Sequence, residues 1–166
     1  MEVRSIEAII RALNAVDVKY LIVGGIAVNA HGYERLTQDI DLVIGLQPDN
    51  IVRGLNALLA IDYHLAIPVT PEEFAERGRR EEWRREKGMV VLKLWSDAHR
   101  RTPIDVFIYE PFDFALEYQR ARWERLAGDT DAPVLAYDAL LAMKAEAGRP
   151  KDLLDIEALR KLDPHR

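Results

Sequence analysis

The amino-acid sequence predicts a single α/β (α+β) domain in which a mixed, twisted β-sheet is flanked by helices and followed by a small C-terminal helical lobe. Three observations indicate this fold class. Strand-like runs fall within residues 20–110, helix-like runs alternate with them, and helical periodicity dominates from residue 111 onward. The 166 residues can bury one substantial core, whereas a second full domain would be crowded. We therefore expect one domain over residues 1–166, with its core in 1–110 and a helical part in 111–166.

The first third of the chain reads as helix, strand, glycine turn, helix and strand. Apolar residues recur at three- and four-residue spacing over 3–16, which predicts a helix with one buried face. The apolar run 20–23 predicts a strand that ends at a glycine pair, from which a helix over 26–31 can begin. Residues 39–44 alternate acid and aliphatic before they become fully apolar. This pattern predicts a strand whose first half reaches a solvent cleft.

The middle of the chain continues the alternation. Periodicity predicts a helix over 49–60 and a short extended piece over 63–67. The segment Thr70-Pro71-Glu72-Glu73 has the form of a capping box, so we expect one helix from residue 71 to about 87. Two β-rich runs, 89–95 and 104–109, are separated by a polar loop and are expected to be antiparallel neighbours.

Helical patterns return after Pro111, and they predict helices over 112–126, 138–147 and 151–162. Gly148 supplies the stop signal for the second of these helices.

Composition and charge exclude several classes of protein. Hydrophobic residues make up 49% and charged residues 31%, as in ordinary globular proteins. The absence of cysteine excludes a disulfide scaffold or a thiolate metal site and favours a reducing compartment. No run approaches the roughly 20 apolar residues needed to span a bilayer, and the net charge of −5 argues against a general nucleic-acid coating protein. We expect a cytoplasmic protein with no membrane partner.

Three acids on two predicted strands form the main candidate site. Asp39 and Asp41 stand at positions i and i+2 of one strand, so their side chains project to the same face. Asp105 lies between Ile104 and Val106 in another strand and can join them from a neighbouring position. Carboxylates placed side by side repel each other unless a cation lies between them. The pattern therefore predicts a metal site, although a solvated strand end remains the alternative.

The chemistry of these ligands limits the metal and the reaction. Three carboxylates without histidine or thiolate form a hard oxygen site, which suits Mg²⁺ or Mn²⁺ held together with substrate phosphates. Phosphoryl or nucleotidyl transfer follows, with Asp105 beside the nucleophile. Gly24 and Gly25 come directly before a predicted helix and offer free backbone N–H groups to a triphosphate. A glycine pair by itself is weak support, because most such pairs are simply turns.

Taken in order, these segments resemble the DNA polymerase β-like nucleotidyltransferase superfamily. Its pattern is an apolar strand with a glycine motif, then Asp-x-Asp, then an isolated acid in a strand. Here these parts read Val23-Gly24-Gly25, Asp39-Ile40-Asp41 and Ile104-Asp105-Val106. The longer strings GGIAVNAHGYERLTQDIDLVI and AGRPKDLLDIEAL are similar to the small bacterial AbiEii/MenA toxin-like group, and the likeness spans nearly the whole chain.

The resemblance implies a nucleotidyltransferase fold, Mg²⁺ as cofactor and a nucleoside triphosphate such as ATP as substrate. It assigns a phosphate contact to Lys144 and matches Asp152 and Asp155 to an acidic pair that follows. Arg35 and Thr37 match the segment before the Asp-x-Asp motif. The resemblance implies that Arg35, Thr37 and Asp152 take part in binding the nucleotide. Many relatives have serine at the position of Gly25, so the phosphate contact at this position would come from the backbone.

Several of these residues also have structural interpretations. Lys144 can be a plain surface lysine, and Asp152 and Asp155 can stabilise a helix dipole or hold Lys144 or Arg149 in place. The basic helix 71–87 carries interleaved glutamates, which favours a solvated face over an RNA-binding one. Trp83 and Trp95 can stack on a base, although aromatic residues beside an apolar strand more often form core or oligomer contacts. His31 is interpreted as a hydrogen-bonded structural residue.

These observations predict a metal-dependent nucleotidyltransferase that moves a nucleoside monophosphate from a triphosphate to an acceptor. The acceptor stays open between a tRNA, a protein and a small molecule, and the toxin-like resemblance adds an antitoxin protein as a candidate partner. Two alternatives remain. One is a nucleotide-binding regulatory or toxin–antitoxin protein with little turnover, and the other is an antibiotic nucleotidyltransferase.

Overall fold

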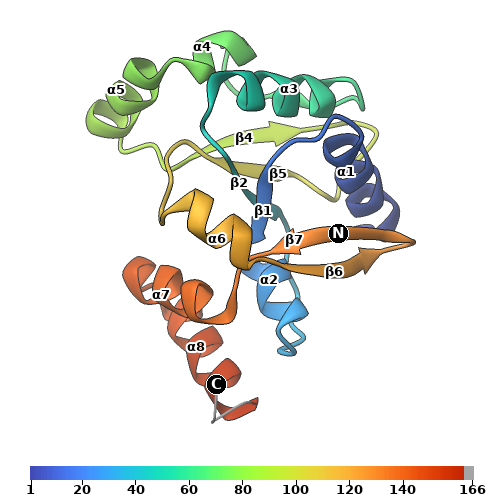
Figure 1. Cartoon of the computed structure of the whole chain (residues 1–166), viewed down its shortest axis with the longest axis vertical. Coiled ribbons are helices and arrows are strands. Elements are labelled where there is room, and N and C mark those ends of the chain that lie inside the picture. The colour runs from blue at the N-terminus through green and yellow to red at the C-terminus, as the bar shows by residue number, and fades with distance from the viewer. Residues whose placement is uncertain (163–166) are drawn as a thin grey trace.

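The computed structural model describes residues 1–162, which form a seven-stranded mixed sheet with helices around it (Figure 1). The strand order is β3-β4-β5-β2-β1-β7-β6. The strands are β1 (Tyr20–Val23), β2 (Ile40–Ile44), β3 (His64–Leu65), β4 (Val91–Trp95), β5 (Ile104–Phe107), β6 (Arg122–Ala127) and β7 (Thr130–Val134). The helices are α1 (Val3–Ala15), α2 (Gly24–Ala30), α3 (Pro48–Leu59), α4 (Pro71–Ala75), α5 (Arg77–Lys87), α6 (Phe114–Arg120), α7 (Tyr137–Ala147) and α8 (Pro150–Leu162).

The centre of the sheet confirms the predicted mixed α/β class. β1 runs antiparallel to β2, β2 runs parallel to β5, and β5 runs antiparallel to β4 as expected from the sequence. All four residues of β1 are buried, because the strand lies inside the sheet and is covered on both faces. Among residues 1–162, no helix is long and apolar enough to cross a membrane.

The helices cover the sheet with the faces that their apolar periodicity predicts. α1 buries Ile6, Ile9, Ile10 and Leu13 and contacts α3, β6 and β7. α7 and α8 pack against each other at one end of the molecule, and α7 also contacts α2 (Figure 1). Gly148 ends α7 in the left-handed conformation, at φ 61°, as its position predicts. These contacts place α7 between α2 and α8.

The predicted helix over 112–126 is wrong in its second half. α6 ends at Arg120, and residues 122–127 form β6, which pairs antiparallel with β7 around a turn at Gly128. β7 then joins the sheet in parallel with β1, through Ile22 and Val134. Residues after 111 therefore contribute two strands as well as helices. The Gly-Asp pair at 128–129 is a hairpin signal, and pairing with β7 overrides the helical pattern of residues 122–127 at the sheet edge.

The expected single helix over 71–87 is divided into α4 and α5 by the extended conformation of Glu76. The capping box at its start is confirmed. Glu73 N–H donates to Thr70 Oγ1 at 3.1 Å, and Thr70 N–H donates to Glu73 Oε2 at 3.0 Å. After the break, buried Arg80 donates to the Phe74 carbonyl at 2.6 Å. That hydrogen bond satisfies a carbonyl at the C-terminal end of α4 that the interrupted helix leaves without an intrahelical partner.

Candidate active site

The three predicted acids meet on one face of the sheet. β2 and β5 are parallel and in register, so Asp41 lies directly beside Asp105. Asp39 precedes β2 and points to the same face as Asp41, because alternate residues of a strand share a face. Ligand oxygens of the three carboxylates all lie within 4.8 Å of one another. One hard divalent cation can take an oxygen from each of them.

The electrostatics of this cluster favour a bound cation. Burial, followed by the charges of Asp39 and Asp105, raises the pKa of Asp41 to about 7, although a hydrogen bond from the Gly25 backbone opposes the shift. A carboxylate with this pKa is short of positive charge in its surroundings. Mg²⁺ or Mn²⁺ supplies that charge, and three oxygen donors are the ligand type these ions prefer. The donor set therefore fits the expected metal.

The glycine pair forms the first two residues of α2 instead of a turn before it. Gly24 has φ +61°, and a Cβ at this position would collide with the Asp41 carboxylate. A Cβ at Gly25 would collide with the hydroxyl of Thr37. Glycine is therefore needed at both positions so that Asp41 and the Thr37 segment can approach the start of α2. The same absence of side chains leaves the backbone N–H groups of this helix start uncovered by a Cβ.

Lys144 is buried in an ion-pair network. Its Nζ lies 3.3 Å from Asp152 Oδ1 and 2.7 Å from Asp155 Oδ2, and its side chain is only 6% exposed. Burial raises the pKa of Asp152 and Asp155, but hydrogen bonds from Arg149, Arg35 and Lys144 outweigh burial and lower both values. Asp152 and Asp155 thus hold Lys144 in place, in line with the structural interpretation. The Lys144 charge also lowers the pKa of Asp41, against the larger effects that raise it.

Arg35 and Thr37 hold the segment that leads into Asp39. Arg35 forms a two-pronged ion pair with Asp155, through Nε at 2.6 Å and Nη2 at 2.9 Å. Its Nη1 donates to the Leu36 carbonyl at 3.0 Å. The Thr37 hydroxyl donates to the Asp39 carbonyl at 3.2 Å. Both side chains therefore fix the backbone next to the acids, and Arg35 ties that backbone to α8.

Sequence reasoning missed Lys93 beside the cluster, and it named Arg149 only as a group that Asp152 or Asp155 can hold in place. Lys93 lies opposite Asp105 on β4, and its Nζ is 3.0 Å from both carboxylate oxygens of Asp105. Arg149 pairs with Asp152 at 2.6 Å while its side chain stays 60% exposed. The alternation of residues 91–95 does place Lys93 on the exposed face of its strand. The pairing with Asp105 depends on the register between two strands, which no local pattern reveals.

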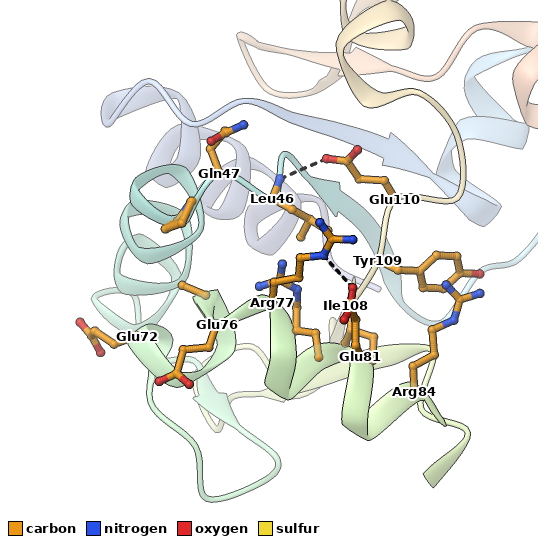
Figure 2. A pocket seen from close by; sticks show the side chains of 13 residues that line it. Leu46, Gln47, Glu72, Glu76, Arg77, Glu81, Arg84, Ile108, Tyr109 and Glu110 are labelled. Atoms are coloured by element: carbon orange, nitrogen blue, oxygen red, sulfur yellow. Dashed lines mark hydrogen bonds and ion pairs between the residues drawn. The ribbon is translucent and has the colours of Figure 1, made fainter. Parts of the chain in front are cut away.

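One cavity lies away from the acids. It has a volume of about 920 Å³ and is lined by Leu46 and Ile108, which follow the C-terminal ends of β2 and β5. The acids stand at the opposite ends of those strands. Figure 2 shows Arg77 and Glu81 of α5 pointing toward each other, and these side chains form a 2.6 Å ion pair. This pairing at helical spacing agrees with the expected solvated face of the basic helix.

Comparison with known proteins gives matches among solved structures. No model of a known family matches the chain, and no curated protein gives a significant sequence match. The lincomycin-bound crystal structure of the lincosamide antibiotic adenylyltransferase LnuA matches with a TM-score of 0.59 and 16% identity, over 95% of each chain. An antigenic nucleotidyltransferase-like protein from Paracoccidioides brasiliensis matches with a TM-score of 0.55 and 18% identity, over 97% of this chain and 76% of that chain. The chain therefore has the nucleotidyltransferase fold, as its motif order predicted.

Proposed function

We propose that this protein is a metal-dependent nucleotidyltransferase that transfers a nucleoside monophosphate from a nucleoside triphosphate to a hydroxyl-bearing acceptor and releases pyrophosphate. The observation that carries the proposal is the convergence of Asp39, Asp41 and Asp105 within 4.8 Å, in a chain with the nucleotidyltransferase fold. Burial, followed by the charges of Asp39 and Asp105, raises the pKa of Asp41, so this carboxylate lacks a compensating positive charge, whereas Asp105 is paired with Lys93. A metal–triphosphate complex supplies that charge together with the substrate.

The order of groups across the sheet suggests where each part of the substrate binds. Gly24 and Gly25 lie on the β1 side of Asp41. The Gly25 N–H donates to Asp41, so the triphosphate would bind to the other backbone N–H groups at the start of α2. Asp39 and Asp41 hold the cation, and Asp105 lies on the far side, next to the attacking hydroxyl. When bound, a divalent cation neutralises phosphate charge and lowers the pKa of the attacking oxygen.

The C-terminal helices contribute cations to the triphosphate side. The buried Lys144 attracts the phosphates through its positive charge, and Asp152 keeps the Lys144 ammonium group in place. Arg149 is bound by the same carboxylate but remains exposed, so its guanidinium can reach a phosphate directly. Lys93 balances Asp105 on the acceptor side. In this arrangement Arg35 and Thr37 position the acid segment and do not touch the substrate.

The identity of the acceptor is the more specific part of the proposal. The match to LnuA over 95% of both chains favours a small-molecule acceptor as the second candidate, although the two chains share only 16% identity. The likeness of the motif strings to AbiEii-type proteins instead favours a tRNA or protein acceptor and a toxin role. A regulatory protein that binds a nucleotide without turnover is the remaining alternative.

The test is an incubation of the protein with Mg²⁺ and each α-phosphate-labelled nucleoside triphosphate, with bulk tRNA, with lincomycin and with no added acceptor. We expect pyrophosphate release and transfer of label to one of these acceptors. Asp41→Asn should abolish transfer because it removes a charged ligand with little change in shape. Asp49→Asn is the matched control, since Asp49 is 80% exposed on α3. Binding of Mg²⁺–triphosphate without pyrophosphate release would favour the regulatory alternative.

A further inference from the structure

An exposed aromatic pair lies on the same sheet face as the acid cluster. Lys93 and Trp95 stand two residues apart on β4, so their side chains share the face to which Asp105 points. Trp95 pairs with His64 on β3, and the two rings lie 4.8 Å apart at an angle of 34°. Trp95 is 48% exposed. Trp83, by contrast, is buried against Phe74 and belongs to the core.

The strand register places this pair beside the acids, on the side away from α2. Leu94 pairs with Ile104, so Trp95 lies next to Pro103. The Ile40 N–H donates to the Pro103 carbonyl at 3.0 Å, which brings the start of β2 to the other side of Pro103. Asp39 and Trp95 are therefore two strand spacings apart, or about 10 Å. The glycine pair lies in the opposite direction, beyond β2.

A small cavity opens between Trp95 and Pro103. It has a volume of about 210 Å³, and Asp97, His99 and Arg100 also line it. This volume is below the usual range for a drug-sized ligand, so it has room for a single planar ring system. Its walls combine an aromatic face with Arg100 and Asp97, which pair with each other at 3.3 Å. Both side chains are exposed, so their remaining donor and acceptor atoms are open to a ligand. An aromatic face with polar groups at the edge is the combination by which proteins bind unpaired nucleobases.

We propose that Trp95, supported by His64, forms a stacking site for the nucleobase of the acceptor, with Lys93 between the base and the reacting hydroxyl. This inference rests on the proposed function, which puts the triphosphate on the glycine side and the acceptor beyond Asp105. The distance of about 10 Å from Asp39 suits a nucleoside whose ribose hydroxyl reaches the acid cluster while its base lies on the indole ring. The base belongs to a free nucleoside or to the end of a single strand.

Equilibrium binding tests the site without requiring turnover. The probes are adenosine, a short oligoadenylate, ribose, Mg²⁺–ATP and Mg²⁺–inorganic triphosphate, each titrated by calorimetry. We expect Trp95→Ala to weaken binding of the base-containing acceptor probes about 10-fold, which corresponds to the usual contribution of one stacked base. Trp95→Phe keeps a ring and should retain most of the affinity. Trp123→Ala is the matched control, because Trp123 is 54% exposed on β6, at the edge of the sheet away from β4.

The outcomes separate the alternatives. Binding of adenosine as tight as that of oligoadenylate would identify a free nucleoside, and binding of oligoadenylate alone would identify a strand end. The proposal is overturned if neither probe binds or if ribose binds equally well. It is also overturned if Trp95→Ala weakens binding of Mg²⁺–ATP but not of Mg²⁺–triphosphate, since the indole ring would then bind the base of the donor nucleotide. A change of oligomeric state in Trp95→Ala without loss of binding would instead identify a subunit contact. Trp95-dependent binding without pyrophosphate release would refute the proposed function and leave the stacking site intact.

Discussion

At the scale of single residues, Asp41 shows how the fold brings negative charges together in a buried place. The side chain lies beside Asp105 on the next strand and two residues after Asp39, and the Gly24 backbone covers it closely. Burial and the two neighbouring charges raise its pKa to about 7 from an ordinary value of 3.8. In the absence of a cation, the folded protein therefore holds a proton at this residue over a pH range in which the unfolded chain has lost it.

This difference predicts a pH dependence of stability for the metal-free protein. The folded state binds more protons than the unfolded state between about pH 4 and pH 7, so the free energy of unfolding falls as the pH rises through this range. The upper limit is about 4 kcal/mol for a shift of this size. Asp41→Asn should remove most of the slope and raise the stability at pH 8. Thermal unfolding with a chelator at pH 5 and pH 8 measures this, and equal slopes in both proteins would contradict it.

At the scale of elements, a buried charge network joins the C-terminal helices to the acid segment. Lys144 of α7, Asp155 of α8 and Arg35 before β2 are linked by ion pairs of 2.6 to 2.7 Å. The carboxylates of Asp152 and Asp155 are at most 2% exposed. Removal of one partner from such a network leaves an uncompensated charge in the interior.

Lys144→Met should therefore destabilise the fold by about 3–5 kcal/mol, because it leaves Asp152 and Asp155 with less positive charge than the wild type provides. Denaturant unfolding measures the loss. Lys144→Met combined with Asp152→Asn should recover part of it, since the second change removes one buried negative charge. A loss below about 1 kcal/mol would mean that the buried network contributes little to stability.

The turn of the β6–β7 hairpin leads to a second prediction at the scale of elements. Gly128 adopts φ +55°, a conformation that costs other residues roughly 1–2 kcal/mol. A Cβ there would also meet the Glu7 carboxylate at 2.6 Å, although that flexible side chain can move aside. Gly128→Ala should destabilise the protein by about 1–2 kcal/mol in denaturant unfolding. Gly78→Ala in α5 is the control of opposite sign, because a Cβ there meets nothing within 4 Å and alanine favours a helix. Equal effects would contradict the hairpin geometry.

At the scale of the whole molecule, the site is assembled from parts far apart in the sequence. β1 and β2 come from the first third of the chain, β4 and β5 from the middle, and α7 and α8 from its end. A ligand that binds several of these parts, and binds only the folded state, stabilises the entire domain. The increase in the free energy of unfolding depends on the ligand concentration relative to its dissociation constant.

Mg²⁺ together with ATP should therefore raise the midpoint of thermal unfolding, by an amount that corresponds to about 2.7 kcal/mol at 100 times the dissociation constant. Removal of Mg²⁺ by a chelator should cancel the gain, and Asp41→Asn should not show it. The gain should also be larger at pH 8 than at pH 6, because the metal competes with a proton on Asp41. An equal gain with ATP alone would contradict a metal site at the three acids.

The sequence by itself determined the local features of this protein. Apolar periodicity predicted α1 and the central strands, the i and i+2 spacing put Asp39 and Asp41 on one face, and the motif order indicated the nucleotidyltransferase fold. These features depend on residues that are close in the chain. Only the tertiary structure decided the pairing of Lys93 with Asp105, the burial of Lys144 and the strand at 122–127. Register and charge balance arise from contacts between distant segments, and packing of those segments can override a local helical preference.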